Sequence, residues 1–315
     1  MPDDPTWRPS TSMAQLIGLA KLRRRLRQYF DTHAVLEVQT AALATHTVTE
    51  PAIDSLSVRV SGLDQALYLQ TSPEYQMKRL LAAGAPDIYQ LGPVFRDGER
   101  GQRHQYEFTL IEWYRVGFAY QQIIDDTVAL IRHALNRRVT CVQHRYADVF
   151  AAALGVNVFT ASHDELAALA PDIDSPAALS RDALLDLLMA TRVDNAFPDD
   201  ALTVITHYPA TQAALAALDP SDPNTALRFE VFYGRLELAN GFVELIDSDE
   251  QAARFALDCE QRQREGKPIP SIDKQFLAAL EYGLPACAGV AMGVERLAMV
   301  ATGSDNINAV VPFPL

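Results

Sequence analysis

The sequence is poor in cysteine, in basic residues and in long apolar runs. Its three cysteines, Cys141, Cys259 and Cys287, are odd in number and widely spaced, which fits free thiols in a reducing cytoplasm better than disulfides or a zinc site. No apolar run approaches the length of a membrane span, and the first residues lack the basic start and apolar segment of a secretion signal. We therefore expect a cytoplasmic protein without a membrane partner.

Positive charge is also scarce, with 27 lysines and arginines against 40 aspartates and glutamates, a net charge of −13 over 315 residues. Nucleic-acid-binding proteins need a basic surface that displaces counterions, so tRNA is not an expected partner. The one basic run, residues 21–27, lies on a helical pattern with a leucine stripe. A solvated helix face is the favoured interpretation of this run, and a docking patch for an acidic partner is the alternative.

Helical and strand patterns alternate along the chain without repeats or linkers. Helices are expected at 12–32, after Ser72 as N-cap, in several segments of 120–200, and after Ile246, where Asp247 and Glu250 have capping-box spacing. Strands are expected at 35–43, 55–60, 66–70, 88–95, 107–118, 202–206, 227–233 and 236–245, and a last strand at 288–293 leads into a helix. Early and late strands that frame helices predict one α+β domain, 1–315, around a mainly antiparallel sheet.

The stretch VFRDGERGQRHQYEFTLIEWY, residues 94–114, combines a strand ending in Arg96, a polar loop and a strand that carries acids. Because side chains alternate along a strand, one face holds Phe108, Leu110, Glu112 and Tyr114. A buried carboxylate needs a partner, so this row is typical of a ligand site. Arg96 can bind a phosphate or carboxylate with two hydrogen bonds, and the loop adds further cations for a polyphosphate: Arg100, Arg103 and His104. Salt bridges to nearby arginines would explain the same acids.

A second hairpin, residues 227–245, turns at 233–235 and carries three glutamates. A bulge at Asn240-Gly241 would bring Glu237 and Glu244 onto one face of the strand. Glu230 and Glu237 flank the turn as magnesium ligands, because hard cations favour carboxylate oxygens beside the phosphates of a nucleotide.

The segment GVAMGVERLAMV joins the last strand to the last helix. Gly289 and Gly293 stand where a backbone must approach another group closely. Arg296 lies in the first turn of the helix, a position that favours anions.

Three segments resemble the three motifs of the class II aminoacyl-tRNA synthetase catalytic core, an antiparallel sheet flanked by helices. They are FDTHAVLEVQTAAL, VFRDGERGQRHQYEFTLIEWY and GVAMGVERLAMV. The strand EFTLIEWY, the triplet SPE at 72–74 and ELANGFVEL resemble the lysyl branch, and the chain as a whole is most similar to the lysyl-tRNA synthetase paralogues that modify elongation factor P. The motif 1 helix begins near residue 12, so an N-terminal anticodon-binding domain is not expected.

This resemblance implies an AMP-forming ligase that uses ATP and Mg²⁺ to activate lysine as an adenylate and transfers it to a lysine of elongation factor P. It also implies a homodimer. Ala291 stands where lysyl synthetases carry glycine, and its methyl group implies (R)-β-lysine in preference to α-lysine. The alternatives are a truncated lysyl-tRNA synthetase-like enzyme and a catalytically dead paralogue that acts as a regulatory binding module.

The resemblance further implies a role for each site residue. The catalytic residues are Arg96 and Arg296. The amino-acid substrate is expected to contact Ser72, Pro73, Glu74, Arg96, Glu112, Tyr114, Asn240, Glu244 and Ala291, with Ser72 and Glu74 near the reacting end and Tyr114 and Glu244 at the distal ammonium. ATP is expected to contact Arg96, Asp97, Gly98, Glu99, His104, Gln105, Phe108, Glu237, Leu238, Gly293 and Arg296, with adenine on Phe108. The magnesium ligands are Glu230 and Glu237.

Two positions depart from the family pattern. Ala41 replaces the proline of motif 1, and Gly98 replaces the acid of the motif 2 pattern Phe-Arg-x-Glu. Either Glu99 takes over this adenine-side role or the contact is missing.

Overall fold

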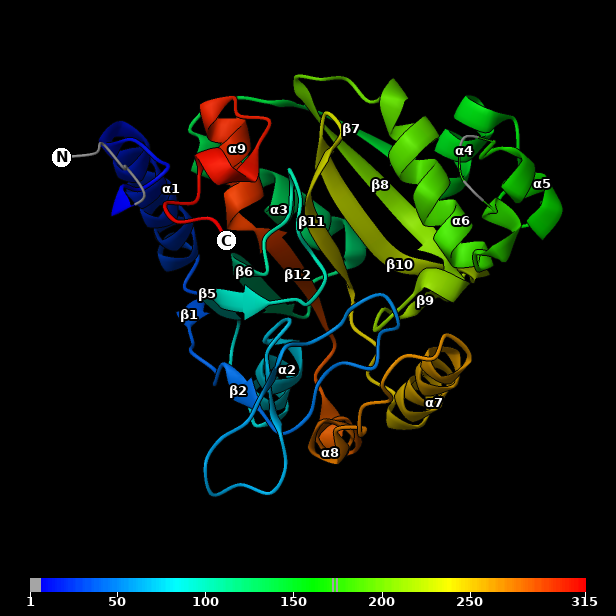
Figure 1. The fold of residues 1–315 in the computed structure, drawn as a ribbon, viewed down its shortest axis with the longest axis horizontal. Coiled ribbons are helices and arrows are strands. Elements are labelled where there is room, and N and C mark those ends of the chain that lie inside the picture. Colours follow the sequence, from blue (N-terminus) through cyan, green and yellow to red (C-terminus); the bar gives the residue numbers. More distant parts are fainter. Residues whose placement is uncertain (1–6, 172, 174) are drawn as a thin grey trace.

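The computed structural model describes residues 7–171, 173 and 175–315. Within these residues, eight strands follow one another across a sheet in the order β1 (Leu36–Glu37), β5 (Ile88–Phe95), β6 (Glu107–Val116), β12 (Cys287–Gly293), β11 (Leu236–Val243), β10 (Asp222–Tyr233), β8 (Ala201–Pro209) and β7 (Thr140–Arg145). A ninth, β9 (Leu218–Asp219), pairs with β10. Among the described strand pairs only β1 with β5 and β7 with β8, at the two ends, are parallel. The prediction of a mainly antiparallel α+β sheet is confirmed (Figure 1).

One face of the sheet carries the largest apolar core. The helices α1 (Met13–Thr32), α3 (Tyr120–Leu135) and α9 (Val294–Thr302) cover this face. Phe30 of α1 stacks on Tyr89 of β5 with ring centroids 4.3 Å apart, and the fully buried Trp113 of β6 lies beside them. Ser12 caps α1 with the reciprocal bonds of a capping box, as expected from its position before the apolar stripe.

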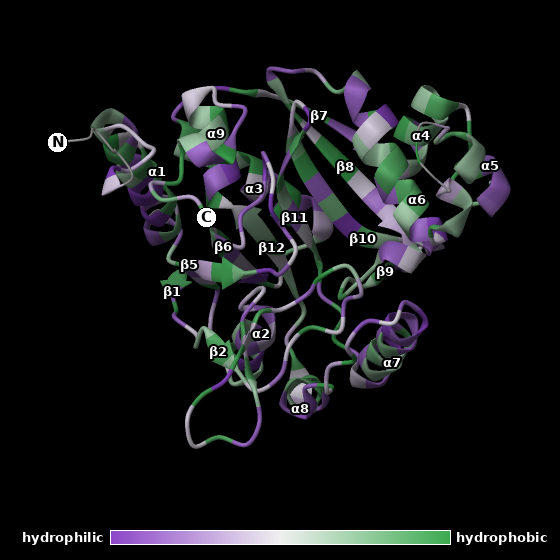
Figure 2. Cartoon of the chain, viewed as in Figure 1, coloured by the Kyte–Doolittle hydropathy of each residue, from purple (hydrophilic) through white to green (hydrophobic). Residues whose placement is uncertain are grey.

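The opposite face carries two separate helix groups. At one end α2 (Glu74–Ala82), α7 (Ser248–Arg264) and α8 (Lys274–Gly283) pack around Phe255 and Phe276, and at the other end α4 (Tyr146–Leu154), α5 (His163–Ala168) and α6 (Arg181–Leu188) pack on β8 and β10 (Figure 1). Peripheral helices such as α7 carry both hydrophilic and hydrophobic turns (Figure 2), as expected for helices with one buried side. No helix in the described part of the chain is long and apolar enough to cross a membrane.

Shorter elements complete the chain. A small sheet has the order β2 (Leu43–Ala44), β4 (Leu67–Leu69) and β3 (Ser57–Val58). Single helical turns lie at Pro176–Ala178, Met189–Val193, Asp194–Ala196, Ala210–Gln212 and Ile307–Ala309.

Several sequence-based predictions of elements were wrong. The segment 35–43 is not one strand, because Leu36–Glu37 joins the large sheet and Leu43 the small one. Strand β7 and helix α8 were missed; β7 is largely exposed and pairs in parallel with β8, so it has no alternating apolar pattern to reveal it. Helix α2 begins at Glu74 with Pro73 at the N-cap position, one residue after the predicted cap Ser72, although the Ser72 hydroxyl still accepts a hydrogen bond from the amide of Glu74 at 3.0 Å.

The bulge in the second hairpin was predicted at the wrong residues. Val231 pairs with Ala239 while the next residue, Phe232, pairs with Glu237, so Leu238 is the extra residue. The pairing of Asn240 and Gly241 with β12 is regular. The bulge still brings Glu237 and Glu244 to one face, because Glu237 faces the cavity with Asn240, the partner of Ala291, and Glu244 contacts Gly289 on the same face of β12.

Asp126 of α3 joins the helix layer to the sheet. It accepts hydrogen bonds from the Tyr29 hydroxyl at 2.6 Å and Trp113 Nε1 at 3.1 Å, and it lies 3.4 Å from Arg115 Nε. Asp126→Ala would leave these buried donors without an acceptor, so we expect the free energy of unfolding to fall by about 3–5 kcal/mol. Urea unfolding measures this free energy. The control is Asp125→Ala at the exposed neighbouring residue, whose free energy of unfolding should stay within about 0.5 kcal/mol of that of the parent. Equal effects of both substitutions would contradict this account.

Candidate active site

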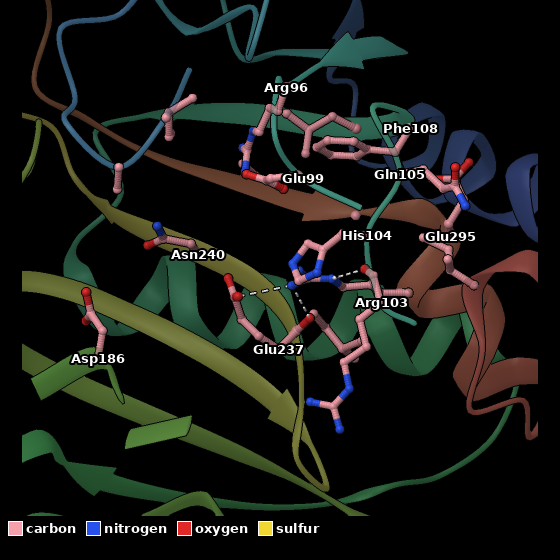
Figure 3. Close-up of a pocket in the computed structure, with 18 residues that line it drawn as sticks. Arg96, Glu99, Arg103, His104, Gln105, Phe108, Asp186, Glu237, Asn240 and Glu295 are labelled. Atoms are coloured by element: carbon pink, nitrogen blue, oxygen red, sulfur yellow. Dashed lines mark hydrogen bonds and ion pairs between the residues drawn. The ribbon is translucent and has the colours of Figure 1, made fainter. Parts of the chain in front are cut away.

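A cavity of about 570 Å³ lies on the sheet face between the two helix groups. Nine of the residues predicted for ATP line it: Arg96, Glu99, His104, Gln105, Phe108, Glu237, Leu238, Gly293 and Arg296. Figure 3 shows His104 and Glu237 close together in the cavity, with Phe108 and Gln105 in another part of it, while the Arg103 side chain turns away from them and donates to the Arg235 carbonyl at 2.9 Å. Asp97 and Gly98 are not among the described residues that line it.

Arg296 organises one wall of the cavity. Its Nη1 donates to the carboxylate and to the carbonyl of Glu237, both at 3.0 Å, and its Nη2 lies 2.7 Å from His104 Nε2. Because arginine only donates, His104 Nε2 is the acceptor and the proton of the ring is on Nδ1. Burial and the positive charge of Arg296 lower the pKa of His104. His104 is therefore a neutral ring at neutral pH and not the cation that the sequence predicted.

Glu237 stays ionised in this arrangement. Burial raises the pKa of its carboxyl, but the charge and hydrogen bond of Arg296 together with the charges of Arg228 and Arg96 outweigh burial, and the net effect lowers the pKa. The carboxylate remains 39% exposed towards the cavity. Arg100, predicted as a further cation for phosphate, is exposed and lines a separate, smaller cavity with Gln102 and Asn306.

Arg96 lies over the ring of Phe108, with its guanidinium carbon 5.2 Å from the ring centroid. Its Nη1 is 3.4 Å from Glu99 Oε1, so Glu99 takes a place beside Arg96 in the absence of an acid at Gly98. Its buried Nε has no hydrogen-bond partner in the described part of the chain. An unpartnered guanidinium donor beside a cavity is suited to an anionic ligand.

A row of residues paired across four strands crosses the sheet under the cavity, and its two middle members, Ala291 and Asn240, line the cavity. Glu112 of β6 pairs with Ala291 of β12, Ala291 with Asn240 of β11, and Asn240 with Glu230 of β10. Directly paired residues share a face of the sheet. The row therefore brings the predicted amino-acid residues Glu112, Ala291 and Asn240 next to the predicted metal ligand Glu230.

Glu112 is the acceptor of a buried hydroxyl cluster. Ser72 Oγ donates to it at 2.7 Å and the Tyr114 hydroxyl at 2.6 Å, while the Glu74 amide donates to Ser72 Oγ at 3.0 Å. Burial, and then the negative charge of Glu74, raise the pKa of Glu112 to about 7. The structure thus brings together four of the residues predicted for the amino acid.

Lys78 of α2 is a residue of this site that the sequence reasoning missed. It is 1% exposed, its Nζ lies 2.7 Å from Glu74 Oε1, and it also pairs with the carboxylate of Glu244. Burial raises the pKa of Glu244 to about 8, although Lys78 acts in the opposite direction. A signal was available, because Lys78 is four residues after Glu74 and follows Met77 on the buried side of the helix.

Gly289 permits the close approach of Glu244 and Tyr114. A Cβ atom at this position would lie 2.4 Å from Glu244 Oε1 and 2.5 Å from Tyr114 Cε1. The predicted need for glycine is therefore confirmed at Gly289. At Gly293, which lines the cavity, a Cβ atom would meet its nearest described neighbour, Arg296, at 3.8 Å, so a close approach to a ligand stays a prediction there.

Glu230 has a guanidinium partner that was also missed. Arg228 Nη2 lies 2.6 Å from Glu230 Oε1, and Arg228 Nε donates to Asn240 Oδ1 at 3.2 Å. Burial, and then the negative charge of Glu237, raise the pKa of Glu230 to about 7. Arg228 precedes Glu230 by two residues, so the strand period alone puts both on one face. The described residues contain no group of three or more His, Cys, Asp or Glu side chains arranged to hold a metal ion.

Gly289→Ala tests the crowding in the buried cluster. The new methyl group would overlap Glu244 and Tyr114, so we expect the free energy of unfolding to fall by about 1–3 kcal/mol. Gly92→Ala on β5 is the control, because its Cβ atom would lie 3.6 Å from Gln90 Nε2; it should be neutral or stabilising by up to about 1 kcal/mol. Urea unfolding of both variants decides, and a Gly289→Ala protein as stable as the control would contradict the geometry.

Comparison with known proteins identifies the family of the chain. The family model of tRNA synthetases class II (D, K and N) matches residues 6–315. The chain is 40% identical over 316 residues to the elongation factor P–(R)-β-lysine ligase of Avibacterium paragallinarum, covering 98% of both chains. It is 42% identical over 317 residues to the ligase of the same name from Vibrio cholerae, covering 98% of this chain and 97% of that one. The ligase of that name from Pasteurella multocida is 41% identical over 313 residues, with 98% and 97% covered.

Proposed function

The chain belongs to the class II tRNA synthetases (D, K and N), and we propose that it activates lysine, in the form of (R)-β-lysine, with ATP and transfers it to a lysine of elongation factor P. The observation that supports this function best is that a cavity suited to a nucleotide and a buried cluster of acids lie next to each other on one face of the sheet. A cavity lined by Arg96, Arg296 and Phe108 meets a buried acid cluster at Ala291 and Asn240. The names of relatives that match nearly the whole chain support the same reaction.

In the first step the carboxylate of the amino acid attacks the α-phosphorus of ATP. A new bond between carboxylate oxygen and phosphorus forms, the bond to the β-phosphate oxygen breaks, and pyrophosphate leaves. Arg96 and Arg296 face the cavity and stabilise the negative charge that develops on the phosphates. No side chain of the protein has to act as a nucleophile in this step, because the carboxylate of the substrate is the nucleophile.

In the second step the uncharged ε-amine of the acceptor lysine attacks the carbonyl carbon of the adenylate. The carbon–nitrogen bond of the amide forms, AMP leaves with the electron pair of the broken carbon–oxygen bond, and the amine loses a proton. Holding the two reactants in line is the main contribution of the enzyme. The acidic net charge of −13 favours a protein acceptor over tRNA.

Recognition of the amino acid rests on charge and on volume. Glu244 and Tyr114 bind the distal ammonium, and Ser72 and Glu74 bind the amino group near the reacting end. Ala291 is paired with Asn240 at the edge of the cavity, so its methyl group narrows the space at the reacting end in favour of the β-amino acid. One methyl group is worth about 1–3 kcal/mol of such discrimination.

Magnesium fits the donor set at Glu230 and Glu237. Their two carboxylates are near enough for the charge of Glu237 to raise the pKa of Glu230, and carboxylate oxygens together with substrate phosphates are the usual ligands of Mg²⁺. When bound, the ion would neutralise part of the phosphate charge.

A homodimer in the cytoplasm completes the proposal. Apolar side chains of α1 and β1 stay exposed: Met13 is 70% exposed, and Ile17 and Leu36 are each 51% exposed. A second copy would remove such side chains from water. The three free cysteines fit a reducing compartment.

ATP–pyrophosphate exchange without tRNA tests the proposed function. Exchange should depend on (R)-β-lysine or α-lysine, with the β-isomer preferred, and incubation with elongation factor P should add one lysyl mass to the factor. Binding of ATP with no exchange for either isomer would favour the dead regulatory module. Labelling of tRNA in preference to the factor would favour the truncated synthetase.

Arg296→Ala tests the catalytic assignment of this arginine. Loss of the guanidinium that faces the phosphates should raise the activation barrier by about 3–4 kcal/mol, seen as a lower rate of pyrophosphate exchange. Arg264→Ala on α7, where the side chain donates to the carbonyl of Glu260, is the matched control and should leave the rate unchanged. A folded Arg296→Ala protein, judged by thermal unfolding, with the parent rate would remove Arg296 from the reaction.

The acid cluster predicts how pH affects amino-acid binding. The pKa values of Glu112 and Glu244, about 7 and about 8, lie above the usual carboxyl value. At a pH between the usual carboxyl pKa and these raised values, the folded protein therefore binds more protons than the unfolded chain. The ligand-free stability should therefore fall as pH rises from about 5 to about 8. An ammonium substrate favours the ionised acids, so lysine should raise the melting temperature more at about pH 8.5 than at about pH 6. Equal shifts at both pH values would exclude these acids as the ammonium site.

A further inference from the structure

The buried ammonium of Lys78 is an unusual feature of a site meant for a cationic substrate. Its side chain is 1% exposed, and its Nζ pairs with Glu74 and Glu244. The rings of Phe242 and Phe276 lie 5.4 Å and 5.8 Å from it and separate it from water on other sides. Burial of an ammonium is costly unless it is paired, so Lys78 depends on these two acids.

The charges of the cluster do not balance within the chain. Three buried or half-buried acids, Glu74, Glu112 and Glu244, surround a site in which Lys78 supplies one positive charge. When all three acids are ionised, two negative charges remain uncompensated. A diamino acid brings two ammonium groups, which is the number needed to neutralise them.

The two oxygens of Glu244 have different surroundings. Oε2 faces Lys78 Nζ, while the buried Oε1 lies at Gly289 and has no hydrogen-bond partner in the part of the chain that the structure describes. Lys78 thus fixes the carboxylate through one oxygen and leaves the other free. A buried carboxylate oxygen without a donor is a place for an incoming N–H group.

We propose that Lys78 is a positioning residue that determines specificity for diamino acids, by holding Glu244 through Oε2 so that Oε1 of Glu244 accepts the distal ammonium of the substrate. The inference rests on the proposed function and extends it to a residue that does not itself touch the substrate. A purely structural Lys78 would instead change the stability of the fold and leave the KM for the amino acid unaltered.

A double-mutant cycle with Glu244 separates these roles. Lys78→Met keeps an unbranched side chain that is one atom shorter and removes its charge. We expect the KM for lysine in pyrophosphate exchange to rise roughly 10- to 100-fold, with the KM for ATP changed less than about twofold. In the Glu244→Gln background the same substitution should change the lysine KM by less than about threefold, because Lys78 acts through Glu244. Arg79→Met, the next residue on α2, is the matched control and should leave both KM values at the parent level.

The outcomes distinguish this inference from the proposed function. An equal rise in lysine KM in both backgrounds, or an unchanged KM in Lys78→Met, would overturn the role of Lys78 while the parent still shows exchange. If Lys78→Met does not fold, the comparison rests on Lys78→Met/Glu244→Gln, which keeps two excess negative charges as in the parent; a lysine KM much above that of Glu244→Gln would overturn the proposal. If the parent lacks exchange, the lysine-induced rise in melting temperature is measured on the same variants instead, and a parent that does not bind lysine refutes both proposals.

Discussion

Three carboxylates on the functional face of this sheet are each paired with a cation, and that cation determines what each part of the site can bind. Glu237 is held by Arg296, Glu230 by Arg228, and Glu244 by Lys78. At Glu237 several arginines, Arg296 foremost, together outweigh burial and lower the pKa of the acid; at Glu244 burial dominates and raises the pKa, so that acid is left short of positive charge. One site therefore contains an anion-binding wall and a cation-binding floor a few strands apart.

The antiparallel register is what joins these two parts. Pairing across β6, β12 and β11 puts Glu112, Ala291 and Asn240 side by side, although they are far apart in the chain. Gly289 lies two residues before Ala291 on the same face of β12. Because it has no side chain, Tyr114 and Glu244 can approach each other across it. The amino acid and the nucleotide can thus meet over β12, whose small side chains leave the space.

The two faces of the sheet have separate tasks. The helices α1, α3 and α9 bury the aromatic core and the Asp126 network on one face, which supplies stability. On the other face the packing is divided between two helix groups, and the cavity lies between them. One of these groups consists of helices that lie between β7 and β8 in the sequence, and its helix α6 contributes Asp186 to the wall of the cavity (Figure 3).

The sequence by itself determined the sheet, the two acid-bearing hairpins and most of the residues that line the cavity. These follow from local rules: the strand period puts Phe108, Glu112 and Tyr114 on one face, and motif spacing identifies Arg96 and Arg296. Tertiary structure alone decided which charges are neighbours. Lys78 and Arg228 became part of the site because helix α2 and strand β10 pack against acids distant in sequence, and His104 lost its expected charge through burial beside Arg296. Strand β7 and the bulge at Leu238 were likewise determined by pairing with neighbouring strands. A one-residue change of register depends on pairing across the sheet and cannot be read from the local sequence pattern.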